Sequence, residues 1–360
     1  MGGGGTLAAA VRSPPNAVTG SRVGTMRAIV VDDWGTPEAL RVRETPTPVP
    51  GDGEVLVETH AAPVNYVDML VVGGKYQFLP PRPFIPGKGP AGVVAALGPG
   101  VTDLRVGDRV LAMAETGGYA EAVAVASGQC HKLPDTMPFT EAASLAVVYD
   151  TSWVALRSRA RLGPGETVLV LGASGGVGHA SVQLARAMGA RVLAGVSRPE
   201  REAAAWSAGA HAIIDLSRPN LRDSLREQVY AETDGRGADV IIDPLGGDIF
   251  GAAIRALAWC GRLVVIGFAA GDIPTLKTNY LLLKNIELSG LQITDYRYRR
   301  PRELKACYAE LFDLYGRGAV KPAPATLFPL DGAAEALSAV RDRRIDGRAV
   351  FRVRARCDSI

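Results

Sequence analysis

The sequence predicts an α/β protein of two domains, one built on a doubly wound parallel sheet and a smaller one built from short strands. Three observations support this prediction. A glycine-rich turn connects an apolar strand to a helix within residues 167–188. Downstream of that turn, short apolar strands alternate with helices. Upstream of it, from residue 26 to residue 130, short strands alternate with Gly- and Pro-rich turns. Repeated strand–helix units are typical of parallel sheets that carry helices on both faces.

The glycine-rich turn is the most informative segment of the chain. Val168–Leu171 is an apolar run typical of a buried strand, and residues 179–188 have the apolar spacing of a helix. Between them Ala173 occupies the first position of a G-x-G-x-x-G pattern. Glycines allow a sharp turn and close backbone approach, and the helix N-terminus offers free N–H groups to a pyrophosphate. The alternative is an ordinary tight turn. The predicted nucleotide-phosphate site comprises Gly172, Ser174, Gly175, Gly176, Val177 and Gly178.

The composition is that of an ordinary soluble enzyme. The chain has 360 residues, enough for two domains, and it is 47% hydrophobic and 21% charged. Its formal net charge of +3 is too small to indicate nucleic-acid binding. Two arginine-rich stretches, at 297–302 and 341–344, are interpreted as solvated faces. No apolar run has the length of a transmembrane helix, so we expect a cytoplasmic protein without a membrane or nucleic-acid partner.

The cysteines and the N-terminal segment give no sign of a secreted or zinc-stabilised domain. The four cysteines form no C-x-x-C pair, which argues against a zinc module or a disulfide framework and fits a reducing cytosol. Residues 1–25 are rich in Gly, Ala, Ser and Pro, and they lack the apolar stretch of a signal peptide. We expect them to form a disordered leader before the first strand at Met26.

The first domain is predicted to span residues 26–150. Prolines and glycines, as in Gly98-Pro99-Gly100, separate its strands. Phe139–Ala155 is predicted to be one helix that leads into the second domain, with Thr140 as its N-cap. The predicted strands are Met26–Val31, Val55–Glu58, Ala91–Leu97, Arg109–Met113 and Ala120–Ala126.

The second domain is predicted to span residues 151–292, and a C-terminal segment, 293–360, is expected to return to the first domain. The predicted strands of the second domain are Val168–Leu171, Arg191–Val196, Ala212–Asp215, Val240–Asp243, Arg262–Ile266 and Ile286–Gln292. Its predicted helices are 179–188, 199–207, 220–232 and 247–258. The C-terminal segment is predicted to contain a helix at 302–316, a strand at Ala325–Pro329, a helix at 331–343 and a strand at Arg348–Val353.

The end of the second strand of this sheet indicates which nucleotide is bound. An NAD site usually has Asp or Glu there, about twenty residues after the glycines, to bind the ribose 2′-hydroxyl. This strand instead ends at Ser197 and Arg198, with Arg201 one turn further on. A hydroxyl and two guanidinium groups suit a 2′-phosphate, so the sequence favours NADPH over NADH. The alternative is that both arginines only begin a solvated helix.

Together these segments resemble the medium-chain dehydrogenase/reductase superfamily, and within it the zinc-free quinone oxidoreductase branch. The resemblance covers residues 26–353, and several motifs in the same order are far more specific than any one of them. The motifs are Val64-Asn65-Tyr66-Val67-Asp68, Gly74-Lys75-Tyr76, Val106-Gly107-Asp108-Arg109-Val110, Gly172–Gly178, Asp243-Pro244-Leu245-Gly246-Gly247, Val265-Ile266-Gly267-Phe268-Ala269 and Leu281-Leu282-Leu283-Lys284-Asn285.

The resemblance implies a GroES-like β domain on the substrate side, a Rossmann domain that binds NADPH, and a cleft between them. It also implies a homodimer formed through the edge of the Rossmann sheet, near residues 285–292. Zinc-dependent relatives have an early Cys, a Gly-His-Glu motif and a four-Cys lobe. Here Val64 precedes Asn65 at the Cys position, the Gly-His-Glu position has Gly87-Lys88-Gly89, and no cysteine lies between Met113 and Tyr119. A catalytic zinc needs about three protein ligands, so we expect no metal.

The resemblance also implies which side chains surround the reaction. Asn65 and Tyr76 are the expected catalytic residues, and Tyr76 matches the proton donor of related enoyl reductases; the alternative is that Tyr76 and Tyr66 only line the pocket. Asp68 is expected to hold a turn. The expected substrate pocket comprises Asn65, Tyr66, Tyr76 and Lys88. Further cofactor contacts are expected from Thr151, Gly267, Phe268 and Arg348.

Three positions depart from the family pattern. Lys88 lies where relatives often have an acidic or neutral residue, which would make the pocket more cationic. Tyr149-Asp150 replaces the usual Gly-Leu before Thr151, and Leu216 follows Asp215 where NADPH-binding relatives often have Tyr. The first two leave the substrate class open, and the third weakens the prediction of NADPH.

The first functional hypothesis is therefore a zinc-independent, NADPH-dependent reductase of a quinone or an α,β-unsaturated carbonyl. An NADPH-binding protein with little turnover is a second hypothesis, against which the presence of Asn65, Tyr76 and Thr151 counts. A third is an enoyl reductase specific to one biosynthetic pathway. A fold alone does not distinguish these functions.

Overall fold

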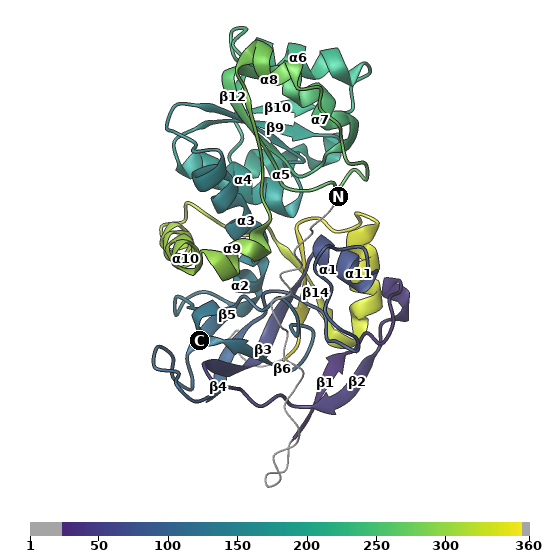
Figure 1. Ribbon diagram of the computed structural model, residues 1–360, viewed down its shortest axis with the longest axis vertical. Coiled ribbons are helices and arrows are strands. Elements are labelled where there is room, and N and C mark those ends of the chain that lie inside the picture. Colours follow the sequence, from purple (N-terminus) through teal and green to yellow (C-terminus); the bar gives the residue numbers. More distant parts are fainter. Residues whose placement is uncertain (1–23, 355–360) are drawn as a thin grey trace, which may run out of the picture.

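The computed structural model describes residues 24–354, which form two large sheets arranged along the long axis of the molecule (Figure 1) and a separate two-stranded one. The predicted leader and the end of the C-terminal segment lie outside the described residues. Helices α3 (Val148–Val154), α9 (Ile293–Arg299) and α10 (Pro301–Gly316) lie at the level where the two sheets meet. Within the described part of the chain, no helix combines the length and hydrophobicity needed to cross a bilayer.

The first sheet has seven strands in the order β14-β15-β3-β4-β5-β7, with β6 paired to β3. The long strand β3 (Glu54–Val64) organises it, because β15, β4 and β6 all pair with β3 in antiparallel register. A separate hairpin joins β1 (Thr25–Ile29) and β2 (Val42–Pro46). The remaining strands are β4 (Ala91–Leu97), β5 (Arg109–Ala112), β6 (Ala122–Ala126), β7 (Cys130–Lys132), β14 (Ala325–Pro329) and β15 (Arg348–Arg352).

The C-terminal strands therefore share a sheet with the N-terminal third of the chain. Helix α11 (Ala333–Arg341) joins them and packs with α1 (Tyr66–Val72) in one apolar cluster that contains Val71, Val72 and Leu337. Figure 1 shows this helix pair beside the first sheet. The arrangement brings Arg348, in the last strand, next to residues that lie almost three hundred positions earlier.

The second sheet has six parallel strands in the order β10-β9-β8-β11-β12-β13. Its central strands are buried on both faces, as is typical of parallel sheets covered by helices. Val168 and Val170 pack into the cluster that contains α4 and α10, whereas Leu169 and Leu171 pack into the cluster that contains α6 and α7. The strands are β8 (Thr167–Leu171), β9 (Arg191–Val196), β10 (Ala212–Asp215), β11 (Ala238–Asp243), β12 (Leu257–Val265) and β13 (Glu287–Gly290). The helices are α4 (Gly176–Ala187), α5 (Glu202–Ser207), α6 (Leu221–Glu232), α7 (Gly247–Ala253) and α8 (Asn279–Lys284).

The structure corrects two predicted helices. The predicted helix Phe139–Ala155 is broken into α2 (Phe139–Leu145) and α3, because Val147 has a φ of 70°, which a continuing helix does not allow. In the predicted helix 247–258, only α7 (Gly247–Ala253) is α-helical. A single 3-10 turn follows it, and strand β12 already begins at Leu257. Apolar residues buried on all sides do not distinguish a helix from a strand, which is why the boundary was misplaced.

Helices α1, α8 and α9 were not predicted. Each has only six or seven residues, which is too short for an apolar repeat to stand out in the sequence. The N-terminus of α1 is nevertheless stabilised by a specific contact, since the Asp68 side chain accepts a hydrogen bond from the Asn65 backbone N–H at 3.0 Å. A carboxylate in the first turn of a helix also interacts favourably with the helix dipole.

Candidate active site

The predicted phosphate-binding turn opens helix α4 directly at the end of β8. Gly172 has a φ of 62°, and a Cβ atom at Gly178 would lie 2.1 Å from the Gly172 carbonyl oxygen, so strand and helix can approach this closely only without side chains there. Gly175, the N-cap of α4, is exposed, and a Cβ atom there would meet only the Gly172 oxygen, at 3.3 Å. The turn thus leaves open space in front of the helix N-terminus, as a bound pyrophosphate requires.

A buried guanidinium group lies beside this turn. The Arg348 side chain comes from β15, and the residue is only 8% exposed. Its Nη2 atom donates a hydrogen bond to Asn65 Oδ1 at 2.7 Å, and its Nη1 atom lies 2.8 Å from where a Cβ of Gly176 would be. Its Nε atom has no hydrogen-bond partner among residues 24–354. Burial lowers the pKa of Arg348. A buried cation with an unused donor next to a helix N-terminus is suited to bind an anion.

Asn65 is held in place from both ends of its side chain. Its Nδ2 atom donates to the Asp68 carboxylate at 3.1 Å, while its Oδ1 atom accepts from Arg348. The buried hydroxyl of Tyr119 donates to the same Asp68 oxygen at 2.7 Å. Burial raises the pKa of Asp68, whereas Lys88, Tyr119 and Asn65 act to lower it. Asp68 therefore orients Asn65 and anchors α1, and Arg348 connects this group to the glycine turn.

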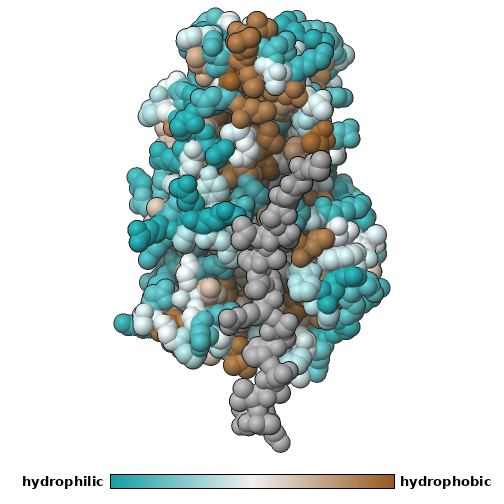
Figure 2. Space-filling model, in the orientation of Figure 1, coloured by the Kyte–Doolittle hydropathy of each residue, from teal (hydrophilic) through white to brown (hydrophobic). Residues whose placement is uncertain are grey.

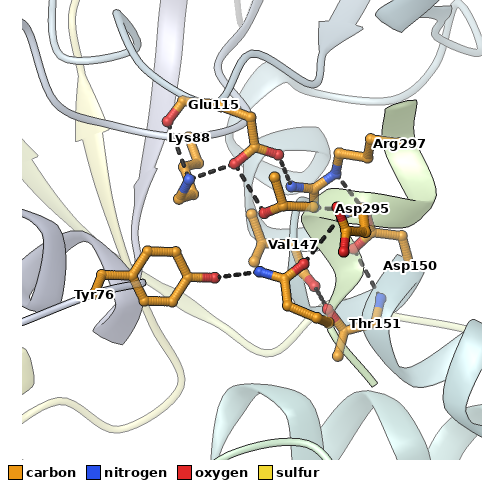
Figure 3. A network of polar contacts seen from close by, with 10 residues as sticks. Tyr76, Lys88, Glu115, Val147, Asp150, Thr151, Asp295 and Arg297 are labelled. Carbon is orange, nitrogen blue, oxygen red and sulfur yellow. Dashed lines mark hydrogen bonds and ion pairs between the residues drawn. The ribbon is translucent and has the colours of Figure 1, made fainter. Parts of the chain in front are cut away.

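Tyr76 lies at the start of the loop after α1, close to the second sheet. Its hydroxyl oxygen accepts a hydrogen bond from Gln292 Nε2 at 2.8 Å, and Lys88 Nζ lies 5.7 Å from the centre of its ring (Figure 3). Burial raises the pKa of Tyr76, so the phenol is neutral at physiological pH. Tyr76 and Lys88 thus lie beside residues of the second domain (Figure 3), and Asn65 reaches the glycine turn through Arg348. Tyr66 is exposed at the start of α1.

Four charged side chains form a network next to Tyr76, and three of them are almost completely buried. Lys88 pairs with the Glu115 carboxylate, Arg297 Nη1 lies 2.6 Å from the other Glu115 oxygen, and Arg297 Nη2 lies 2.7 Å from Asp150 Oδ2 (Figure 3). The side chains of Arg297 and Asp150 are 3% and 0% exposed. The prediction that Arg297 belongs to a solvated face is therefore wrong. Within this network two positive charges balance two negative ones. The sequence suggested that Lys88 makes the pocket more cationic, but its charge is neutralised by this pairing.

The electrostatics of this network favour the ionised states of Glu115 and Arg297, whereas burial raises the pKa of Asp150. Burial favours a higher pKa for Glu115, but Arg297 and Lys88 beside it lower that pKa to about 2. Burial also acts to lower the pKa of Arg297, but Asp150 and Glu115 raise it. A buried pair of this kind holds two elements in a fixed relative position, because the loss of one partner leaves an unpaired charge without water.

Glu115→Gln is expected to destabilise the protein by about 3 kcal/mol near neutral pH, since it removes the carboxylate that Lys88 and Arg297 share. The folded-state pKa of about 2 lies below the ordinary value of 4.5. The stabilisation is therefore complete above the ordinary pKa and is lost as the pH falls toward the folded-state pKa. Urea unfolding of wild type and variant along a pH series measures it, with the exposed Asp313→Asn, which removes an ion pair with Arg317, as control. A difference in stability that does not change with pH would contradict the lowered pKa of Glu115.

The remaining predicted cofactor residues lie at the carboxyl ends of the parallel strands or on α3. Thr151 is buried and donates its hydroxyl to the Val147 carbonyl, and Gly267 and Phe268 follow β12. Ser197 and Arg198 are exposed after β9. Arg201 instead donates to the carbonyls of Arg343 and Ile345 and pairs with Asp346. Its side chain therefore binds the loop between α11 and β15.

Family models match two parts of the chain. Residues 51–135 match the alcohol dehydrogenase GroES-like domain, and residues 176–311 match the zinc-binding dehydrogenase domain. A quinone oxidoreductase-like protein 2 homolog from Nematostella vectensis is 36% identical over 328 residues, which cover 90% of this chain and 88% of the relative. The chain belongs to the quinone oxidoreductase branch of the medium-chain dehydrogenase/reductase superfamily. The predicted family is therefore confirmed.

Solved structures of the superfamily share the complete fold. A mycobacterial protein solved in complex with NADPH is 32% identical and superimposes with a TM-score of 0.84, covering 91% of this chain and 100% of its own. The quinone oxidoreductase of Escherichia coli, also solved with NADPH, is 26% identical, with a TM-score of 0.84 and the same coverage. The predicted combination of a GroES-like domain with a Rossmann-like parallel sheet is confirmed.

One of the two matched families is named for zinc binding. Among the described residues, no three His, Cys, Asp or Glu side chains lie close enough together to hold a metal ion. At the position of the Gly-His-Glu motif, the side chain of Lys88 forms an ion pair with Glu115. The ammonium group of a lysine cannot coordinate a metal while it is protonated.

Proposed function

We propose that this quinone oxidoreductase family member is a zinc-independent, NADPH-dependent reductase of a quinone or an α,β-unsaturated carbonyl. One observation carries the proposal: the buried Arg348 guanidinium spans from the glycine turn to Asn65 and so joins a phosphate-binding helix N-terminus to the polar residues of the first sheet. A nucleotide on that turn would have its reactive end near Asn65 and Tyr76. This is the arrangement needed for a reaction between a bound cofactor and a substrate held by the GroES-like domain.

The residues of this chain fit NADPH. The open space before Gly175 suits the pyrophosphate, and the unused Nε donor of Arg348 suits an oxygen of the cofactor. Ser197 and Arg198 are exposed where the 2′-phosphate would lie, and both solved relatives described above are NADPH complexes. When bound, NADPH supplies the hydride. The protein contributes binding, orientation and hydrogen bonds to the substrate oxygen, on which negative charge develops.

Replacement of both arginines, Arg198→Ala with Arg201→Ala, is expected to weaken NADPH binding about 10- to 100-fold and NADH binding much less, since only NADPH has the 2′-phosphate that charged donors bind. Arg201 would exchange its contacts with the 343–346 loop for the phosphate. Titration of both cofactors by fluorescence measures the effect, with Arg317→Ala, an exposed arginine paired with Asp313 at the end of α10, as control. Equal losses for the two cofactors would show that the 2′-phosphate is bound elsewhere.

The charge balance next to Tyr76 favours a neutral acceptor. Lys88 and Arg297 are neutralised by Glu115 and Asp150, so within this network no charge is left to bind a carboxylate or phosphate of the substrate. Quinones and enones are neutral, and each accepts a hydride with charge developing on an oxygen. The Tyr76 phenol is a neutral donor that could stabilise that charge.

The test of this proposal is NADPH oxidation with 1,4-benzoquinone, 9,10-phenanthrenequinone and a 2-alkenal, each repeated with NADH. We expect NADPH to be oxidised in the presence of a quinone or of the alkenal. The acceptor that is reduced fastest indicates the substrate class. NADPH binding without turnover of any acceptor would favour the second hypothesis, a cofactor-binding protein of little activity. Oxidation of NADH at the same rate as NADPH would contradict the assignment of NADPH as the cofactor.

We also propose that the protein is a homodimer formed through the edge of the parallel sheet. Strand β13 is the last strand of this sheet. Trp259 of the neighbouring strand β12 is 73% exposed, and Leu282 and Leu283 of α8, which contacts β12, are 78% and 72% exposed. Figure 2 shows apolar residues gathered near the end of the molecule where Figure 1 places α8. An exposed apolar patch beside an unpaired strand edge is typical of an association surface.

The proposed dimer predicts that Leu282→Asp with Leu283→Asp yields a monomer, because charges would then stand where the dimer buries two leucines. Sedimentation velocity of wild type and variant measures this, with Leu79→Asp, an exposed leucine of the first domain, as control. A wild type that sediments as a monomer would contradict the proposal.

A further inference from the structure

The Gln292 side chain connects the parallel-sheet domain to Tyr76. Gln292 lies between β13 and α9 and is the N-cap of α9, where its Oε1 atom accepts a hydrogen bond from the Asp295 backbone N–H at 3.0 Å. Its Nε2 atom donates to the Tyr76 hydroxyl oxygen at 2.8 Å, the contact drawn beside Tyr76 in Figure 3. The two contacts use opposite ends of one amide group.

The helix cap determines which end of the amide faces the tyrosine. A backbone N–H at a helix start requires an acceptor, and only the oxygen of the amide is one. Rotation of the amide by half a turn would place its NH2 group against the Asp295 N–H, two donors facing each other. The NH2 group must therefore face Tyr76, whose oxygen is then the acceptor in that contact. The hydroxyl proton of Tyr76 therefore cannot point toward Gln292. Thr294, whose own hydroxyl donates to Glu115 at 3.1 Å, is the neighbouring side chain that can accept this proton, and a substrate would have to take its place.

We infer that Gln292 is a positioning residue that holds Tyr76 as a proton donor to the substrate. The inference rests on the proposed function and selects within it the class of α,β-unsaturated carbonyls, whose reduction requires a proton on carbon. After hydride has been added to the β-carbon, the electron pair of the C=C bond lies on the α-carbon and oxygen as an enolate. The Tyr76 O–H bond breaks, its proton bonds to the α-carbon, and the phenolate that remains takes a proton from water.

The surroundings of Tyr76 suit this role. The charged groups that face it are Lys88, Glu115 and Arg297, and their network keeps the nearby charges paired. Gln292 stabilises the phenolate after the transfer, because its NH2 group donates to the same oxygen. Tyr76 and Gln292 come from different domains, so the oriented donor exists only when the two domains are in this arrangement. Proton transfer is thereby coupled to domain closure.

Gln292→Glu reverses the polarity of this contact and tests the inference. The introduced carboxylate still accepts from the Asp295 N–H, so the helix cap is retained, but its second oxygen is now an acceptor for the Tyr76 proton. We expect kcat for the 2-alkenal to fall about 100-fold or more, close to the level of Tyr76→Phe, with NADPH affinity unchanged. As the pH is lowered and the introduced carboxyl becomes protonated, it donates to Tyr76 again, and kcat should recover. Tyr76→Phe should show no such recovery.

A second measurement needs no turnover. In protein with 13Cζ-labelled tyrosine, the resonance missing from Tyr76→Phe identifies Tyr76, and its titration gives the pKa of the phenol. Gln292→Glu is expected to raise this pKa by more than one unit, because a donor to the phenolate becomes a negative charge. Gln292→Leu, which removes the donor without adding a charge, should raise it less.

The two readouts distinguish the possible failures. If wild type reduces none of the acceptors, the proposed function fails, and the pKa series alone decides whether Gln292 donates to Tyr76. If wild type reduces the 2-alkenal and Gln292→Glu is equally active at neutral pH, the inference is overturned. A loss of activity that does not recover at low pH, with no change in the Tyr76 pKa, would also overturn it, since it would indicate only a structural effect.

Discussion

Gly175→Val is expected to reduce NADPH affinity by at least about 100-fold while the protein stays folded, because the branched side chain would occupy the space of the pyrophosphate. The free protein should tolerate the change. Gly175 has an extended backbone conformation that valine adopts readily, with a φ of −83°, and a Cβ atom there meets only one atom of the protein, at 3.3 Å. Equilibrium titration with NADPH measures the affinity, and circular dichroism with thermal unfolding measures the fold.

Two other glycines serve as comparisons. Gly178→Ala should destabilise the fold itself, since its Cβ atom would lie 2.1 Å from the Gly172 carbonyl oxygen. Gly128→Val, in the turn before β7 with no atom near its Cβ position, should change neither fold nor affinity. Unchanged NADPH affinity in a folded Gly175→Val variant would show that the glycine turn does not hold the cofactor.

The largest loss of stability is expected from Arg297→Met, about 3 to 5 kcal/mol. The substitution leaves Asp150 and Glu115 without their shared cation, and the Asp150 side chain has no contact with solvent in the folded protein. Methionine fills much of the same volume, so the loss reports mainly on the unpaired charges. Urea unfolding followed by circular dichroism measures the free energy of unfolding.

A second substitution separates charge from packing. Adding Asp150→Asn to Arg297→Met should restore part of the stability, because the amide carries no charge, so the double variant should lose less than the sum of the single variants. Arg299→Met, at an exposed position of the same helix where the arginine pairs with Asp295, should change stability by no more than about 0.5 kcal/mol. An Arg297→Met variant as stable as wild type would contradict the buried network.

The parts of the fold that the sequence predicted are those determined by short segments. The glycine turn could be recognised because the strand before it, the glycines and the helix after it are contiguous, and each has a distinct composition. The central strands of the parallel sheet are mostly apolar and separated by helices, so their order along the chain predicts their type. The short helices α1 and α9 could not be predicted in this way. Each has only seven residues, too few for an apolar repeat, and its start is marked only by the capping contacts of one or two side chains.

The candidate site was predicted only where a motif marks it. Asn65 and Tyr76 lie in motifs of the family, and Arg348 is a position that the resemblance implies. Glu115, Arg297 and Gln292 belong to no such motif. The partners of the last three are far away in the sequence: Arg297 and Glu115 are separated by 182 positions, and Gln292 and Tyr76 by 216. Arg297 lies in an arginine-rich stretch whose other members are exposed, and only the three-dimensional structure shows that it faces Asp150.

The central claim is that NADPH binds at the glycine turn and is oxidised by a substrate at the junction of the two domains. The most direct test is the decrease of NADPH absorbance in the presence of the preferred acceptor, measured for wild type and for Gly175→Val at the same protein concentration. We expect steady turnover by wild type and none by the variant. Wild type that leaves NADPH unoxidised with every quinone and enone, or a folded variant that oxidises it as fast as wild type, would contradict the claim.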